Sequence, residues 1–354
     1  MIRMFNKIKR VTSSDEYYPE IDGLRFISIL FVIICHLSNH FFEFSGIKNS
    51  IIENILENGH NGVRIFFSIS GYLLMLNALK DLNINKFYKR RLIRIEPPYL
   101  ISLFIIYIII YHRNLNENLN HLISSIFYLH SFIYNSASTI SPISWSLEVE
   151  IQFYISFPFV FFIIEYFERK YKKGIIIILL LISIGLVINY YYTPTFRTIL
   201  DNITYFYTGA LIAYLSKQKK SIILAIKPIF VSIYLLGISF LLIYINSVNS
   251  NIILQCLYLF LIYLLFYFIR VYESGFRNLI TSKFIITTGS MCYTIYLYHI
   301  IILLLFNKYF FNYMKNEPGK ILLYYIIYLI FTWLTSSILY SLFEKPFMKK
   351  SIIK

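Results

Sequence analysis

Apolar segments of about 20 residues recur along the whole chain, and they constrain its fold more than any other feature. A membrane-spanning α-helix needs a run of that length, whereas the strands of a transmembrane barrel alternate in segments of about 10 residues. Runs such as 174–189 and 252–268 do not alternate. Only 14% of the 354 residues are charged, against about 25% in soluble proteins, and 58% are hydrophobic. The sequence therefore predicts an all-α integral membrane protein, and it excludes a soluble globular domain or a disordered chain.

We expect a polytopic bundle of about ten transmembrane helices, forming one domain over residues 1–354. The expected spans are 22–42, 62–79, 97–112, 147–167, 174–192, 199–216, 228–246, 252–270, 284–307 and 320–342. A shorter apolar piece, 121–134, is expected to re-enter the membrane or to lie at its outer interface. Both chain ends are then on the inside, so that 1–20 and 345–354 are cytoplasmic tails.

The basic residues set this orientation. With the N-terminus inside, 26 of the 33 Lys and Arg residues lie at the cytoplasmic side, as the positive-inside rule requires. The net charge of +15 then reflects contact with anionic membrane lipids, and no nucleic acid partner is expected. No small-residue cleavage site follows the basic N-terminus, which indicates a retained first span and not a signal peptide. Cys35, Cys256 and Cys292 lie in apolar runs and are expected to be small buried side chains, and no spacing predicts a metal site.

Two ionisable residues share one face of the first expected span. Arg25 and His36 are eleven positions apart, which is about three helical turns and roughly 16 Å along the axis. Arg25 would lie near the cytoplasmic end and His36 in the outer half of the membrane. A neutral imidazole there can accept a proton from a hydroxyl group. The alternative is a histidine that only packs the bundle through a hydrogen bond.

A basic motif precedes the third span, where the sequence predicts a cytoplasmic loop and a helix start. It contains Arg90, Arg91 and Arg94, and the last two share a helix face. Planar guanidinium groups in such a pair suit phosphate groups. The alternative is that these arginines fix the topology and contact lipid headgroups.

Carboxylates mark the outer end of the fourth span. Glu150 and Tyr154 are four positions apart and share a face, whereas Glu148 points elsewhere. A carboxylate in an apolar helix needs a partner, and His36 is a plausible one at similar depth. Trp145, at the start of this span, is expected to anchor it at the membrane interface or to support the substrate.

Two further segments carry polar residues. Tyr293, Tyr296 and His299 lie on one helix face, where they either support the substrate or stitch the bundle together. In 61–72, Ser68, Ser70 and Gly71 favour close helix packing. The other histidines are expected near the outer interface, where a solvated imidazole is ordinary: His40, His60, His112, His121 and His130.

Six blocks in order give the chain a resemblance to the acyltransferase family 3 membrane proteins of bacteria. The blocks read IDGLR with an R-x10-H spacing, GVRIFFSISGYLL, RLIRIEPPYL, WSLEVEIQFY, CYTIYLYH and the closing EKPF that begins at Glu344. The resemblance covers nearly the full length. Cys292 stands where a serine is usual in the family, and no hydrolase-like domain follows within these residues, so no two-stage transfer within the chain is expected.

The resemblance implies a membrane O-acyltransferase that moves an acyl group, often acetyl from cytosolic acetyl-CoA, to a glycan hydroxyl. It implies essential roles for Arg25 and His36, binding of the CoA phosphates by Arg91 and Arg94, and a family glutamate at Glu150. The expected partners are acyl-CoA, a glycan or lipid-linked saccharide, and the lipids of the bacterial cytoplasmic membrane, with no bound cofactor. His36 would act as general base or carry the acyl group transiently, and both routes stay open.

Two rival functions belong to other classes. One is a transporter that flips a lipid-linked glycan, and the other is a non-catalytic subunit of polysaccharide assembly. Transporters commonly show related halves and broken midplane helices, which this sequence lacks. Acetyl against succinyl, the identity of the glycan, the membrane face of its modification and the oligomeric state are left open.

Overall fold

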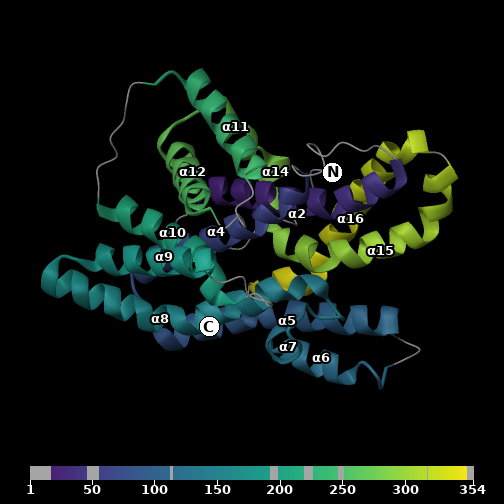
Figure 1. The fold of residues 1–354 in the computed structure, drawn as a ribbon, viewed down its shortest axis with the longest axis horizontal. Coiled ribbons are helices and arrows are strands. Elements are labelled where there is room, and N and C mark those ends of the chain that lie inside the picture. Colours follow the sequence, from purple (N-terminus) through teal and green to yellow (C-terminus); the bar gives the residue numbers. More distant parts are fainter. Residues whose placement is uncertain are drawn as a thin grey trace. The chain divides into compact units, whose positions relative to one another are not determined.

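The fold is seen in a computed structural model, which describes residues 17–45, 56–111, 115–191, 198–218, 226–245, 251–316 and 318–348. Helices dominate these ranges, and none of their residues lies in a strand (Figure 1). The prediction of an all-α fold is therefore confirmed. The expected tail residues 1–16 and 349–354 lie outside the described residues.

Seven helices are long and apolar enough to cross a membrane. They are α2 (Pro19–Ser45), α5 (Ile84–Tyr111), α8 (Trp145–Tyr171), α9 (Gly174–Tyr191), α12 (Ile252–Val271), α15 (Cys292–Asn316) and α16 (Ile321–Leu339). Large apolar side chains are exposed along them, for example Leu180 at 52% and Ile330 at 56%. Such exposed apolar faces are expected where helices meet lipid.

Three other expected spans form helices outside this set of seven. The helices are α4 (Asn61–Ala78), α10 (Ile199–Gln218) and α11 (Pro228–Tyr244). α11 is apolar but only 17 residues long. α4 and α10 carry polar residues such as Arg64 and Asp201, which lower their hydropathy. The count of ten spans and the inside position of both chain ends stay predictions.

Several predicted boundaries were wrong. α5 begins at Ile84, so the basic motif lies within a helix and not at a loop and helix start. The expected span 284–307 consists of two helices, α14 (Lys283–Ser290) and α15, with a break at Met291. Near this break the hydroxyl groups of Thr287 and Thr288 donate to carbonyl groups one turn back, a pattern that bends helices. After α16 the chain continues into a π-helical turn, Tyr340–Glu344.

The short piece 121–134 forms two helices that are joined by a turn, α6 (Leu119–Ile126) and α7 (His130–Tyr134). The longer has 8 residues, which is about 12 Å, far below the roughly 30 Å of a bilayer core. Neither helix can cross by itself, as expected. A position at the outer interface stays a prediction.

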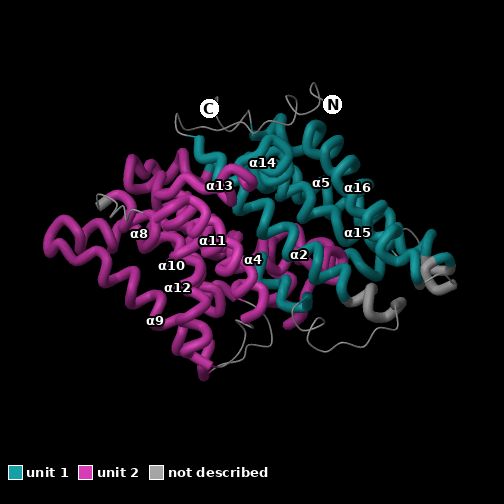
Figure 2. Tube along the Cα trace, turned by 90° about the horizontal axis from the view of Figure 1, so that it is seen from above, with its two compact units in different colours: residues 1–62, 89–119, 281–354 teal, residues 63–88, 120–280 magenta. Residues whose placement is uncertain are grey.

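The chain divides into two compact units, which Figure 2 colours separately. The first unit comprises 1–62, 89–119 and 281–354, and the second comprises 63–88 and 120–280. In the first unit, α14, α15 and α16 pack against α2. A methyl group on Gly289 of α14 would lie 1.8 Å from the carbonyl oxygen of Asp22, so this contact requires glycine.

In the second unit, α4 packs closely against α10. A methyl group on Gly71 would lie 1.9 Å from the carbonyl oxygen of Phe206, and one on Gly209 would lie 1.9 Å from that of Ser68. The Ser68 hydroxyl donates to the carbonyl oxygen of Tyr205 at 3.0 Å. The predicted close packing by the small residues of 61–72 is therefore confirmed.

The cysteines are free, but only Cys292 is buried. Cys256 is exposed on α12, which corrects the prediction that all three are buried. In a membrane protein an apolar run also supplies the face that meets lipid, so an apolar neighbourhood in the sequence does not require burial.

Candidate functional site

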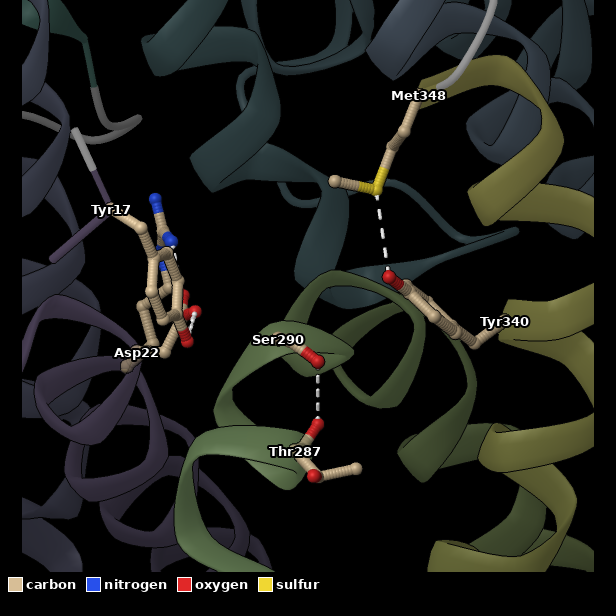
Figure 3. Close-up of polar contacts among 7 residues, drawn as sticks. Tyr17, Asp22, Thr287, Ser290, Tyr340 and Met348 are labelled. Atoms are coloured by element: carbon tan, nitrogen blue, oxygen red, sulfur yellow. Dashed lines mark hydrogen bonds and ion pairs between the residues drawn. The ribbon is translucent and has the colours of Figure 1, made fainter. Parts of the chain in front are cut away.

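Arg25 lies in the first turns of α2, where an acidic residue holds it. Its Nη1 atom donates to the Oδ1 atom of Asp22 at 2.6 Å, and the two side chains are 11% and 2% exposed. Tyr17 donates its hydroxyl to the other oxygen of Asp22 at 3.1 Å, and Figure 3 shows these two side chains next to each other. Sequence reasoning missed Asp22, although an acidic residue three positions before Arg25 on a helix was the available signal.

His36 and His299 come together within the first unit. The centres of their rings are 5.3 Å apart, and the ring of Tyr296 lies 5.8 Å from that of His299. His299 is fully buried on α15, and Tyr328 of α16 donates its hydroxyl to the backbone carbonyl of His299 at 3.0 Å. Two histidines that the sequence placed in separate segments thus form one pair.

Glu344 fixes the start of the helix that carries His299. Its carboxylate is buried, and the Oε2 atom accepts hydrogen bonds from the backbone N–H of Thr294 at 3.2 Å and from the Thr294 hydroxyl at 2.5 Å. A carboxylate at the N-terminus of a helix is also favoured by the helix dipole. The geometry therefore supports a positioning role for Glu344, in a π-helical turn of the kind frequent at functional sites.

The π-helical turn and the end of α14 are held by further polar contacts. Figure 3 shows Tyr340 facing the sulfur of Met348, and Ser290 facing Thr287 at the end of α14. On α15 itself, Tyr293 donates its hydroxyl to the carbonyl oxygen of Ile95 on α5 at 3.0 Å. Tyr293 therefore ties α15 to the helix that carries the basic motif.

The three arginines of the basic motif lie on α5, in the turns before Pro97 and Pro98. Arg90 is exposed, and Arg91 and Arg94 are half-buried one turn apart. All three belong to the first unit, as do Arg25 and His36. The donor set consists of guanidinium groups on one rigid helix, and this set fits phosphate groups.

Glu150 is held by two hydroxyl groups within the second unit. Its Oε1 atom accepts hydrogen bonds from Ser70 of α4 at 3.0 Å and from Tyr154 one turn further along α8. This confirms that Glu150 and Tyr154 share a face, and it gives Ser70 a polar contact that the sequence did not reveal. Because Glu150 and His36 belong to different units, their pairing stays a prediction.

Two other residues of α8 frame this carboxylate. Trp145, the first residue of the helix, is half-buried with its ring 6.3 Å from that of Phe67. Glu148 is 1% exposed, and its Oε2 atom accepts a hydrogen bond from the backbone N–H of Ser131 at 2.9 Å. Glu148 does point away from the hydroxyl groups that hold Glu150, but its burial against α7 had no signal in the sequence.

The prediction of a solvated His130 was wrong. Its ring is fully buried, and its Nε2 atom lies 3.0 Å from the Nδ1 atom of His121. The His130 Nδ1 atom faces the carbonyl oxygen of Ser136, so Nδ1 carries the proton and Nε2 accepts from His121. Burial, and then the neighbouring His121, lower the pKa of His130 below its ordinary value. His112 and the side chain of His40 lie outside the described residues.

Comparison with protein families gives one match over most of the chain. The family model described as an acyltransferase domain, acyltransferase 3, matches residues 18–341. Within the described ranges, no group of three or more His, Cys, Asp or Glu side chains is arranged to hold a metal ion.

Known proteins with similar sequences carry one activity in their names. The chain is 28% identical over 382 residues to O-acetyltransferase OatA of Staphylococcus aureus, in strains NCTC 8325 / PS 47 and COL. The alignments cover 98% of this chain but only 59% of those relatives. No solved structure matches the chain.

Proposed function

The chain belongs to the acyltransferase 3 family, and on that premise we propose that it is a multi-pass membrane O-acetyltransferase of the bacterial cytoplasmic membrane. It takes an acetyl group from cytosolic acetyl-CoA and transfers it to a hydroxyl group of a cell-surface or exported glycan. The names of the relatives support the transferred group, although the chain spans only 59% of their length. The observation that carries the proposal is the grouping of Arg25, His36 and the arginines of α5 in one unit.

In this proposal the arginines of α5 bind the donor. Arg91 and Arg94 receive the phosphate groups of CoA, with Arg90 as a further cation at the exposed end of the motif. A guanidinium group donates two parallel hydrogen bonds to phosphate, which fixes the donor in orientation as well as in place. Oriented binding matters because transfer requires the thioester carbonyl and the hydroxyl oxygen within near-attack distance.

His36 handles the proton of the acceptor hydroxyl. As a general base it takes this proton while the oxygen attacks the thioester carbonyl and the carbon–sulfur bond breaks. The departing thiolate then receives the proton from the His36 imidazolium, so no proton is gained or lost. In the covalent route the imidazole attacks first, and the acceptor oxygen then displaces the acetyl group from the ring. Both routes require a neutral His36 at the start.

Glu150 contributes a negative charge in a fixed orientation. Its Oε1 atom is engaged by Ser70 and Tyr154, whereas its Oε2 atom has no hydrogen-bond partner within the described part of the chain. That oxygen is available to accept a hydrogen bond from the glycan or from an imidazolium. Trp145 and Tyr154 supply the aromatic surface beside it on which a sugar ring can rest.

Mass spectrometry of the envelope glycan tests this function against transport. We compare wild-type bacteria, a strain without this chain, and that strain carrying the His36→Ala variant. The proposal predicts loss of about one acetyl group per repeat in both mutant strains, with export of the glycan preserved. A glycan that keeps its acetyl content but no longer reaches the surface would instead identify a transporter.

A further inference from the structure

The two nitrogen atoms of His299 have different surroundings. Its Nδ1 atom lies 2.8 Å from the carbonyl oxygen of Tyr296 and 3.2 Å from that of Ile295. Carbonyl oxygens only accept hydrogen bonds, so Nδ1 carries the proton and Nε2 presents a lone pair. The ring is fully buried, and Nε2 has no hydrogen-bond partner among the residues that the structure describes. A buried acceptor of this kind is costly unless a donor reaches it.

The nearby imidazole ring of His36 can supply that donor. The ring centres of His36 and His299 are 5.3 Å apart, with an angle of 47° between the ring planes. The second histidine pair of this chain gives a standard for comparison. His121 and His130 are joined by a hydrogen bond of 3.0 Å between nitrogen atoms, and their ring centres are 5.2 Å apart. The separation of His36 and His299 therefore matches that of two hydrogen-bonded imidazole rings.

We propose that His299 is a positioning residue that selects the tautomer of His36. One ring nitrogen of His36 donates its hydrogen to the Nε2 atom of His299. The other ring nitrogen of His36 must then carry the lone pair that acts on the acceptor hydroxyl. When His36 takes up the hydroxyl proton, the hydrogen bond to His299 becomes one from a charged donor and strengthens. No proton passes to His299, and the consequence for catalysis rests on the proposed function.

The surroundings of His299 are suited to this role because its own position is fixed. Its Nδ1 atom is bound to the backbone of its own helix, and its carbonyl group is bound by Tyr328 of α16. Glu344 holds the first turn of α15 through Thr294. The titratable side chains next to the pair are the phenols of Tyr296 and Tyr328, which are neutral at physiological pH. A rigid acceptor with one free lone pair is what tautomer selection requires.

Nitrogen NMR of histidine-labelled protein, reconstituted in lipid without acetyl-CoA or glycan, tests the pair directly. The chain has 7 histidines, and the His299 signals are assigned by their loss in the His299→Asn variant. We expect a protonated Nδ1 and an unprotonated, hydrogen-bonded Nε2 whose signal moves in the His36→Ala and His36→Gln variants. The matched control is His121→Asn, which breaks the other histidine pair and leaves the His299 signals unchanged. A protonated Nε2, or an Nε2 signal that ignores both His36 variants, would overturn the proposal.

Transfer measurements then separate positioning from packing. The amide of Asn reaches about as far as Nδ1, so His299→Asn keeps the hydrogen bond to the backbone and loses the acceptor for His36. We expect its maximal rate to fall about tenfold to hundredfold, the value of one hydrogen bond to a charged group, with unchanged acetyl-CoA binding. In His299→Gln the side-chain oxygen reaches the place of Nε2 and restores part of the rate. Equal rates for folded His299→Asn and wild type would contradict the role in catalysis but leave the NMR result intact.

Discussion

Among the single residues of the first unit, Arg25 and His36 differ in how cleanly they can be tested. Arg25 is buried and paired with Asp22, so removal of either partner leaves a buried charge, which costs about 3–5 kcal/mol of stability. Loss of activity in an Arg25 variant would therefore mix lost function with lost fold. His36 is half-buried and is not an ion-pair member at neutral pH, which makes it the better residue for a functional test.

The first prediction concerns His36. His36→Gln keeps hydrogen-bonding capacity but cannot take a proton, so we expect a folded protein with a rate lower by about 10²–10⁴-fold. Binding of acetyl-CoA is unaffected. The measurement is acetyl transfer together with the thermal midpoint of the purified variant. A histidine that only packs the bundle predicts the opposite: an active Gln variant, and an Ala variant lost through instability.

The second prediction concerns the donor site. Arg91→Ala and Arg94→Ala each remove a charge-assisted contact of about 1.5–3 kcal/mol, so the dissociation constant for acetyl-CoA rises roughly tenfold to hundredfold. Replacement by Lys rescues only part of the affinity, because an ammonium group lacks the planar fork. Isothermal titration with acetyl-CoA gives these constants.

The matched control for the donor site is Arg169→Ala. Arg169 pairs with Glu165 on α8, and its side chain is 77% exposed. We expect no change in acetyl-CoA affinity. If the Arg91→Ala, Arg94→Ala double variant binds acetyl-CoA as tightly as this control, the donor lies elsewhere.

At the scale of helices, close contacts without side chains hold the second unit together. In Gly71→Ala and Gly209→Ala, a methyl group would meet a backbone carbonyl at 1.9 Å, which backbone atoms cannot yield without a shift. We expect each change to cost about 1–3 kcal/mol, measured as a lower thermal midpoint. Gly237 of α11 is the control, because a methyl group there has no atom within 4 Å among the described residues. Gly237→Ala is expected to be neutral or stabilising by up to about 1 kcal/mol.

The sequence predicted the elements where a local pattern is sufficient. Apolar runs located α9 and α12 within a few residues, and the i,i+4 spacing of Glu150 and Tyr154 predicted their shared face. The break at Met291 could not be read, because the apolar pattern continues across it and the packing of Gly289 against Asp22 depends on the fold.

Side-chain partners from distant segments were also beyond the sequence. Ser70 is 80 positions from Glu150, and the pairing of His36 with His299 requires α2 and α15 to be packed together. Glu148 and His130 were missed for the same reason. Their burial depends on how α7 packs against α8, and neither helix shows this in its own pattern.

For the whole molecule, the asymmetry of basic residues predicts orientation. Residue 90 and both chain ends are expected in the cytoplasm, and residues 114–120 outside. Single cysteines at positions 90 and 117 of a cysteine-free variant report this through an impermeant reagent in intact cells. We expect position 117 to be labelled and position 90 to be protected until the cells are opened. Labelling of position 90 from outside would reverse the orientation and move the donor site to the wrong side of the membrane.

The central claim is acetyl transfer by this chain itself, and the most direct test is transfer in a reconstituted system. Purified protein in lipid vesicles receives labelled acetyl-CoA and envelope glycan prepared from a strain that lacks the chain. The account predicts label in the glycan as an alkali-labile ester, and its near-complete loss in the folded His36→Gln variant, which still binds acetyl-CoA. Label that appears equally with wild type and His36→Gln, or no label from folded wild-type protein that binds acetyl-CoA, would contradict it.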